Sequence, residues 1–109
     1  MKSDERYVID VAKDFTPKPY GRYVADDAER SAEVFRRNFL IPAFEKKKPF
    51  VVDLSGSNRY GSSFLEEAFG GLVRDGVHES DLELMEVKHD LLPSIVEEIK
   101  FYIDRARSE

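Results

Sequence analysis

The run Phe50-Val51-Val52-Asp53-Leu54 decides the fold, together with the run that follows it, Arg59-Tyr60-Gly61-Ser62-Ser63-Phe64-Leu65-Glu66-Glu67-Ala68-Phe69-Gly70-Gly71-Leu72. The first run is apolar on successive residues, which is typical of a strand covered on both faces. The second places apolar residues at helical spacing after two adjacent serines. Free backbone N–H groups meet the positive end of the helix dipole at such a start, which makes it a natural seat for an anion or phosphate. The sequence therefore predicts a strand–loop–helix unit over residues 49–74.

Strand and helix patterns alternate along the rest of the chain. We expect strands at 7–11, briefly at 22–24, at 50–54 and at 82–88, and helices at 30–45, 63–74 and 91–106. Such alternation predicts one α/β domain over residues 1–109, with a mixed sheet of about four strands and helices packed against it. In this arrangement the 50–54 strand lies inside the sheet, neither at its edge nor in a helix.

The helix ends are set by polar and turn residues. Asp26 or Asp27 is a plausible start for the first helix, with Ser31 as the competing cap, and Asp90 or Ser94 is expected to start the last one. Pro42 should bend the first helix or confine its final turn, since it lacks a backbone donor. Gly70 and Gly71 inside the second helix each cost roughly 1 kcal/mol relative to Ala. Close approach of another backbone would be the usual structural reason for them.

Composition narrows the function classes. The 109 residues carry a formal net charge of −5 and no Cys, which excludes disulfides, thiol catalysis and thiolate metal sites and fits a reducing compartment. The acidic balance argues against a nucleic-acid partner, and the run of three lysines at 46–48 is expected to be a solvated helix end. No apolar run approaches the length of a membrane span, so we expect a cytoplasmic protein with no membrane partner.

The two adjacent serines have different expected duties. Ser63 and Glu66 fit the capping-box pattern, in which the serine accepts from the Glu66 amide and the glutamate reaches back. Ser62 lies one residue outside that box and has no obvious structural role. A phosphate there would add a charge of about −1.5 to −2 beside the helix start. The alternative is that both serines simply begin a helix.

Taken together, these motifs resemble a known family. The order strand, helix, a strand ending Val51-Val52-Asp53-Leu54-Ser55, a serine pair at a helix start, strand and terminal helix resembles the STAS domain of bacterial anti-sigma factor antagonists. The chain is more similar still to the small bacterial STAS-like family, a domain of unknown function, through 60–72, Ser31-Ala32-Glu33-Val34-Phe35-Arg36 and Leu40-Ile41-Pro42-Ala43.

The resemblance implies a regulatory role in protein–protein interaction. In the antagonists the motif is Asp-Ser-Ser/Thr-Gly, and its first serine, which corresponds to Ser62, is phosphorylated by a partner kinase. Here Gly61 stands in place of the Asp and Phe64 in place of the Gly. By resemblance we expect a protein partner, for which a histidine-kinase-like ATPase is one candidate. The expected contact residues are Arg59, Tyr60, Gly61, Ser62, Ser63 and Glu67. The alternative is a non-switching adaptor or homodimer without phosphorylation.

We expect neither catalysis nor the binding of a metal or cofactor. A catalytic Ser62 would need a base and an oxyanion hole, and the chain has only His78 and His89 and no Gly-x-Ser-x-Gly elbow, so we expect no enzyme. The spacing around the two histidines matches no recognised metal site, and neither metal nor cofactor is predicted. Tyr20, Arg22 and Tyr23 mark either a contact surface or a packed turn.

Overall fold

The sheet is three-stranded and parallel. The structure, a computed structural model, describes residues 6–109, and within that range the strands lie in the order β1 (Tyr7–Asp10), β2 (Phe50–Asp53) and β3 (Met85–Lys88). Both pairings are parallel, so the expectation of a mixed sheet with about four strands is wrong. The central place of the strand at 50–53 is confirmed, and its first three residues are buried.

Two long helical segments connect the strands, and a third follows them. The first comprises α1 (Ala32–Phe35) and α2 (Ile41–Glu45), joined through a wide π-type turn at Arg36–Leu40. The second comprises α3 (Ser62–Leu65) and α4 (Gly71–Arg74), joined through a similar turn at Glu66–Gly70. Helix α5 (Glu79–Leu82) is one short turn, and α6 (Pro93–Arg107) ends the fold. The three predicted long helices are thus confirmed within two residues at each end.

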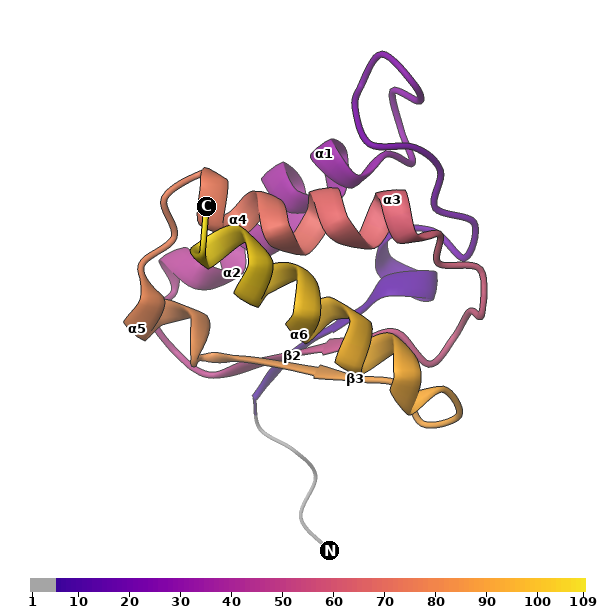
Figure 1. The fold of residues 1–109 in the computed structure, drawn as a ribbon. Helices are drawn as coiled ribbons and strands as arrows, with labels where there is room; N and C mark the ends of the chain where they lie inside the picture. The colour runs from indigo at the N-terminus through magenta and orange to yellow at the C-terminus, as the bar shows by residue number, and fades with distance from the viewer. Residues whose placement is uncertain (1–5) are drawn as a thin grey trace, which may run out of the picture.

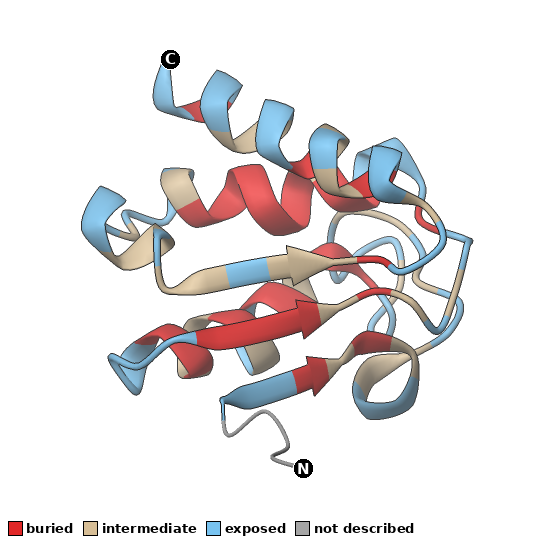
Figure 2. Cartoon of the chain, turned by 90° about the horizontal axis from the view of Figure 1, so that it is seen from below, coloured by how far each residue is buried: buried red, intermediate tan, exposed pale blue. Residues whose placement is uncertain are grey.

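The long helices all lie on one side of the sheet, and the short α5 lies beyond the end of the strands (Figure 1). Parallel crossovers are right-handed in nearly all proteins, and each step here moves in the same direction across the sheet, so both connecting helices reach the same face. Figure 2 looks onto the other side of the strands, which no helix of the described residues covers. There Arg6 reaches from beside β1 to Glu86 on β3, with 2.6 Å between Nη1 and Oε1, and Val8 stays 40% exposed.

The predicted strand at 22–24 is instead a turn. Gly21 has φ of +79°, and the Asp26 carboxylate accepts hydrogen bonds from the backbone N–H groups of Arg22 and Tyr23, at 3.1 and 3.0 Å. A side chain that occupies these donors leaves them unavailable to a neighbouring strand. The first strand also ends earlier than predicted, because the Asp10 carboxylate accepts from Lys13 N and caps a π-type turn at Val11–Phe15.

The helix starts differ in part from the expectation. Ser31 caps α1 through its hydroxyl, which accepts from Val34 N at 3.3 Å, so Asp26 and Asp27 do not start this helix. Helix α6 begins at Pro93, and in the described chain no side chain caps it, which corrects both Asp90 and Ser94. Proline suits the first helical position because the missing donor would be unpaired there in any case.

The core lies between the sheet and its single helical layer. It is rich in aromatic rings, with Phe35, Phe50, Phe64 and Phe69 almost fully buried. A Cβ on Gly70 would lie 2.8 Å from Glu66 Oε2 and 3.5 Å from the Tyr102 carbonyl oxygen, so the tight neighbour there is a side chain, and the expected approach of another backbone is an ordinary van der Waals contact. Gly71 has a different reason: a Cβ would collide with the Arg36 guanidinium. The glycine pair thus fits α6 on one side and a buried cation on the other.

Candidate functional site at the start of helix α3

The helix with the serine pair begins one residue earlier than the capping pattern predicts. Gly61 is the N-cap residue, with φ −69° and ψ 151°, and no side chain in residues 6–109 caps the helix. Ser62 and Ser63 are the first two helical residues, and both are exposed. The predicted capping box of Ser63 and Glu66 is therefore wrong. Both hydroxyls are left on the surface without a capping duty.

Glu66 binds arginines instead of reaching back to the helix start. Its carboxylate accepts from Arg22 Nη1 at 2.5 Å and from Arg74 Nη1 at 2.8 Å. Burial by itself would raise the pKa of Glu66, but the hydrogen bonds from Arg74 and Arg22 outweigh it and hold the pKa below its usual value. These bonds tie the 17–30 loop to the α3–α4 helix through Arg22.

Glu67 lies inside the protein. It is 7% exposed and pairs with Arg36, itself 6% exposed, with 3.1 Å between Oε2 and Nη1. The Arg36 guanidinium also donates to the Glu67 carbonyl oxygen and, through Nε at 2.7 Å, to Asp75. A buried ion pair needs such additional hydrogen bonds to offset its desolvation. Glu67 therefore holds two helical segments together and is not available to a partner, which corrects its assignment as a contact residue.

Tyr60 is also inaccessible. It is 9% exposed, its ring packs near Phe64 and His89, and its hydroxyl is buried without a hydrogen-bond partner among residues 6–109. Burial, followed by the negative charges of Asp10 and Asp53, raises the pKa of Tyr60. Of the six predicted contact residues, the structure thus leaves four at the surface: Arg59, Gly61, Ser62 and Ser63.

The 17–30 loop carries exposed aromatic side chains and places one of them, Tyr20, beside Ser63. Tyr20 is 60% exposed, Tyr23 49% and Val24 44%. A surface hollow of about 400 Å³ is lined by Ser63 together with Tyr20, Gly21, Arg22 and Asp26. The loop is fixed to α1 by backbone hydrogen bonds from Ala32 N to Gly21 O and from Glu33 N to Arg22 O. Residues about 40 positions apart in the sequence therefore form one surface, to which Tyr20 and Arg22 belong, and Tyr23 follows them in the same loop.

Helix α6 supplies a further polar pair close to Ser62. The Tyr102 hydroxyl donates to Glu98 Oε2 at 2.6 Å, and this bond raises the pKa of Tyr102. The neighbouring Ser62 hydroxyl acts in the opposite direction on the pKa of Tyr102, without reversing the rise. A charged group on Ser62 would therefore lie near the Glu98 carboxylate as well as near the helix start.

Both histidines have structural partners. His89 is 5% exposed; its Nδ1 accepts from Leu91 N and Leu92 N, and its Nε2 lies 2.8 Å from Ser57 O. Since Nδ1 accepts, Nε2 must carry the proton and donate to Ser57 O. His78 accepts from Ser80 N at the start of α5. In the described part of the chain, no group of three or more His, Cys, Asp or Glu side chains is placed to hold a metal ion.

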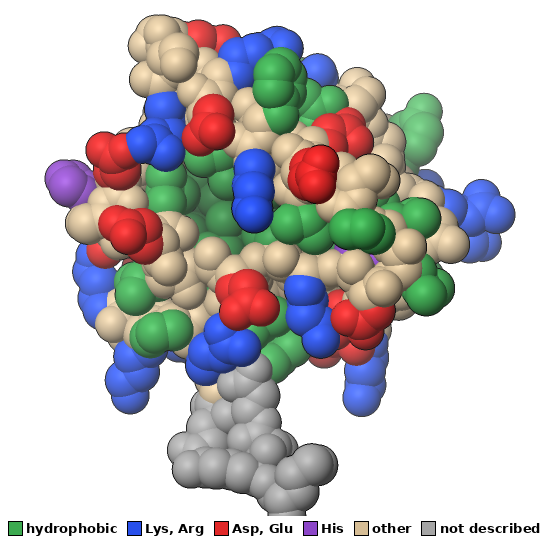
Figure 3. Space-filling view, turned by 60° about the horizontal axis from the view of Figure 1, so that its bottom comes forward, with side chains coloured by type: hydrophobic (Ala, Val, Ile, Leu, Met, Phe, Trp, Pro, Cys, Tyr) green, Lys and Arg blue, Asp and Glu red, His purple; other side chains and the backbone are tan. Residues whose placement is uncertain are grey.

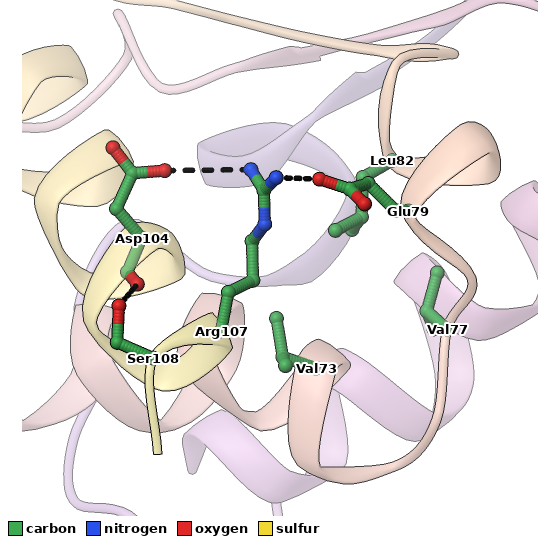
Figure 4. Close-up of a pocket in the computed structure, with 7 residues that line it drawn as sticks. All are labelled: Val73, Val77, Glu79, Leu82, Asp104, Arg107 and Ser108. Atoms are coloured by element: carbon green, nitrogen blue, oxygen red, sulfur yellow. Dashed lines mark hydrogen bonds and ion pairs between the residues drawn. The ribbon is translucent and has the colours of Figure 1, made fainter.

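A larger hollow lies away from the serines, between α4, α5 and the end of α6. It measures about 550 Å³, and its lining residues are Val73, Val77, Glu79, Leu82, Asp104, Arg107 and Ser108. Figure 4 shows the Arg107 guanidinium between Asp104 and Glu79, so that an ion pair crosses the hollow. Figure 3 shows hydrophobic side chains recessed between charged ones on the neighbouring face. No pattern in the sequence predicts these hollows.

Over residues 6–109, no helix is both long and apolar enough to cross a bilayer. No curated protein and no solved structure matches the chain. A family model does match, over residues 31–90, which is more than half of the chain and includes both Ser31 and the serine pair. The chain belongs to the family described as a STAS-like domain of unknown function (DUF4325).

Proposed function

We propose that this STAS-like domain is a regulatory interaction module that docks a partner protein through the start of α3 and the loop beside it. The docking surface comprises Tyr20, Arg22, Tyr23, Ser62 and Ser63. One observation carries the proposal: two adjacent exposed serines do not cap their helix, and the exposed Tyr20 lies with Ser63 around one surface hollow. Tyrosine and arginine are enriched at the centres of protein interfaces.

The partner class follows from the family resemblance. Anti-sigma factor antagonists bind a kinase through the corresponding serine, and a histidine-kinase-like ATPase is therefore the first candidate partner. Ser62 is the proposed modified residue, because it is exposed and makes no capping hydrogen bond. A phosphate at Ser62 is stabilised by the helix dipole and opposed by the nearby Glu98 carboxylate. Added charge and bulk at this position weaken the docking of a partner that contacts the hydroxyl.

The test begins with the native host. Affinity purification of the tagged chain, followed by mass spectrometry, reads partners and phosphosites together. Purified partner is then titrated against wild type, Ser62→Ala and Ser62→Asp. We expect Ser62→Ala to retain binding and Ser62→Asp to weaken it at least tenfold, with phosphate found on Ser62.

A matched control comes from the last helix. Ser94 is exposed and is the second residue of α6, so Ser94→Asp adds the same charge near a helix start outside the docking surface. This variant should bind as wild type does. Equal affinities of all the variants, with no phosphate on Ser62, would support the non-switching adaptor or homodimer instead.

A further inference from the structure

The run of three lysines at 46–48 is divided by the turn that ends α2. Lys47 has φ of +56°, and its ammonium reaches Asp81, with 2.9 Å between Nζ and Oδ2. Lys47, Glu45 and Asp81 belong to the lining of one surface hollow. Lys46 and Lys48 line a different hollow, to which neither of these acidic residues contributes. The turn therefore brings two of the three cations together on a side of the chain that lacks Glu45 and Asp81.

The hollow of Lys46 and Lys48 lies at the amino ends of β1 and β2, beside the last turn of α2. It measures about 470 Å³. Small-molecule pockets usually measure about 300–1,000 Å³. Its lining residues are Arg6, Tyr7, Ala43, Lys46, Lys48, Pro49 and Phe50. The sheet register pairs Tyr7 with Phe50, so the two aromatic side chains project from neighbouring strands on the same face.

The charge of this hollow is positive. Among the residues that the structure describes, no acidic residue lines it, and neither Lys46 nor Lys48 forms an ion pair. The Lys46 ammonium lies over the Tyr7 ring, 3.7 Å from its centroid, and this cation–π contact holds it at the hollow with N–H donors open to an acceptor. Arg6 at the rim pairs with Glu86. Two lysine charges are thus concentrated here, although the whole chain has a net charge of −5.

The rest of the lining is apolar. Ala43 and Phe50 are almost fully buried and form the floor, while Pro49 and Tyr7 are exposed at the sides. An apolar group that covers such a floor releases water from it, which is favourable. The hollow therefore offers two separate kinds of contact, an apolar surface and a pair of ammonium groups.

We propose that this hollow binds a small organic anion, in which a phosphate or carboxylate head group is attached to a flat apolar body. The head group is held by the ammonium groups of Lys46 and Lys48, and the body packs against Tyr7, Pro49 and Phe50. Ligand pockets commonly combine apolar walls with a few charged groups that fix orientation. A long polyanion such as nucleic acid is disfavoured, because it needs many more cations than two and is repelled by the net negative charge of the chain.

Titrations followed by the NMR signals of the backbone amides test the hollow directly. The probes are phenyl phosphate and benzoate, which differ in head group, and benzyl alcohol and inorganic phosphate, which each lack one half of the proposed ligand. In wild type, the tighter-binding aromatic anion should shift the amide signals of Tyr7, Lys48 and Phe50 in a saturable way, and its head group identifies the class of anion. Benzyl alcohol, without the charge, and inorganic phosphate, without the ring, should each bind at least tenfold more weakly.

Lysine variants separate this site from a solvated helix end. Lys46→Gln and Lys48→Gln together should raise the Kd of the aromatic anion at least tenfold, and the amide spectrum shows whether the variant is folded. Lys47→Gln is the matched control, since Lys47 lines the other hollow, and its Kd should stay within about twofold of wild type.

Three results would overturn the proposal: shifts that do not saturate, an aromatic anion that binds no more tightly than benzyl alcohol or inorganic phosphate, and a Kd that the double variant leaves unchanged. The hollow lies at the amino ends of β1 and β2, whereas the serine pair follows the carboxyl end of β2. None of these outcomes therefore depends on partner docking.

Discussion

At the residue scale, the buried Arg36 explains why Glu67 is buried and why a glycine stands at position 71. Its guanidinium donates hydrogen bonds to Glu67 and Asp75 and occupies the space beside Gly71, where an added Cβ would collide with Nη1. Arg36 and Glu67 are 31 positions apart in the sequence, and charged residues are expected at the surface. The sequence pattern therefore assigns Glu67 to the exposed face, and only the packed structure reveals the ion pair.

Gly71→Ala tests this arrangement. Alanine favours a helix by about 1 kcal/mol, but the displaced guanidinium loses charged hydrogen bonds of about 1.5–3 kcal/mol each. We expect a net loss of about 2 kcal/mol in the free energy of unfolding, measured by urea denaturation. Gly61→Ala is the control, since a Cβ there meets nothing within 4 Å and the change should cost less than about 1 kcal/mol. A Gly71→Ala variant as stable as wild type would contradict the account.

Glu66 makes stability depend on acid pH. Its pKa is lowered from the ordinary value of 4.5, so the folded state binds this proton less readily than the unfolded state. The resulting stabilisation is fully present above that ordinary value and is lost as the pH falls through the lowered pKa. Wild type should exceed Glu66→Gln in stability at about pH 7, and the difference should shrink towards about pH 3. A difference that stays constant across this range in urea titrations would be inconsistent with the arginine contacts.

At the element scale, apolar periodicity predicts the helices and strands that are long or buried. Apolar spacing correctly predicts the 50–53 strand, the α3–α4 helix and α6. Burial of one face repeats apolar residues every two positions in a strand and every 3.6 positions in a helix. The same spacing does not predict the helix caps or the turn at 22–24, because local hydrogen bonds determine these features. Asp26 takes the N–H groups of Arg22 and Tyr23, and Gly61 starts α3 although two serines stand next to it.

The next prediction concerns Ser62 and Ser63 at the start of α3. Because neither hydroxyl caps the helix, Ser62→Ala and Ser63→Ala should each change the free energy of unfolding by less than about 0.5 kcal/mol. Ser31→Ala is the matched comparison, since Ser31 does cap a helix, and it should cost about 1 kcal/mol. Chemical denaturation of the three variants decides the matter. A cost near that of Ser31→Ala at Ser63 would restore the capping box.

The end of α2 contains a strained residue. Lys47 has φ of +56°, a conformation that costs a non-glycine residue roughly 1 kcal/mol. Lys47→Gly should therefore raise stability by about 0.5–1 kcal/mol, even though it removes the exposed Lys47–Asp81 ion pair. Glu45→Gly, within the helix, should instead lower it by up to about 1 kcal/mol. If thermal unfolding shows both variants destabilised alike, the turn is not strained.

At the scale of the whole molecule, the docking surface lies beyond the carboxyl end of the central strand β2. The 54–61 loop connects the end of β2 to the start of α3, where the docking surface lies. The resemblance identifies the serine pair from the sequence, but not the neighbouring tyrosines as part of the same surface. Their proximity depends on the fixed 17–30 loop, which is held by Asp26 and by hydrogen bonds to the α1 start.

The most direct test of the docking surface is the affinity of the captured partner for four proteins: wild type, Ser62→Asp, Tyr20→Ser and Ser94→Asp. Isothermal titration gives each Kd, and urea denaturation confirms that every variant is folded. The account predicts at least tenfold weaker binding for Ser62→Asp and Tyr20→Ser, whose changes lie on one surface, and wild-type affinity for Ser94→Asp. Unchanged affinity in Ser62→Asp and Tyr20→Ser, or an equal loss in Ser94→Asp, would contradict it.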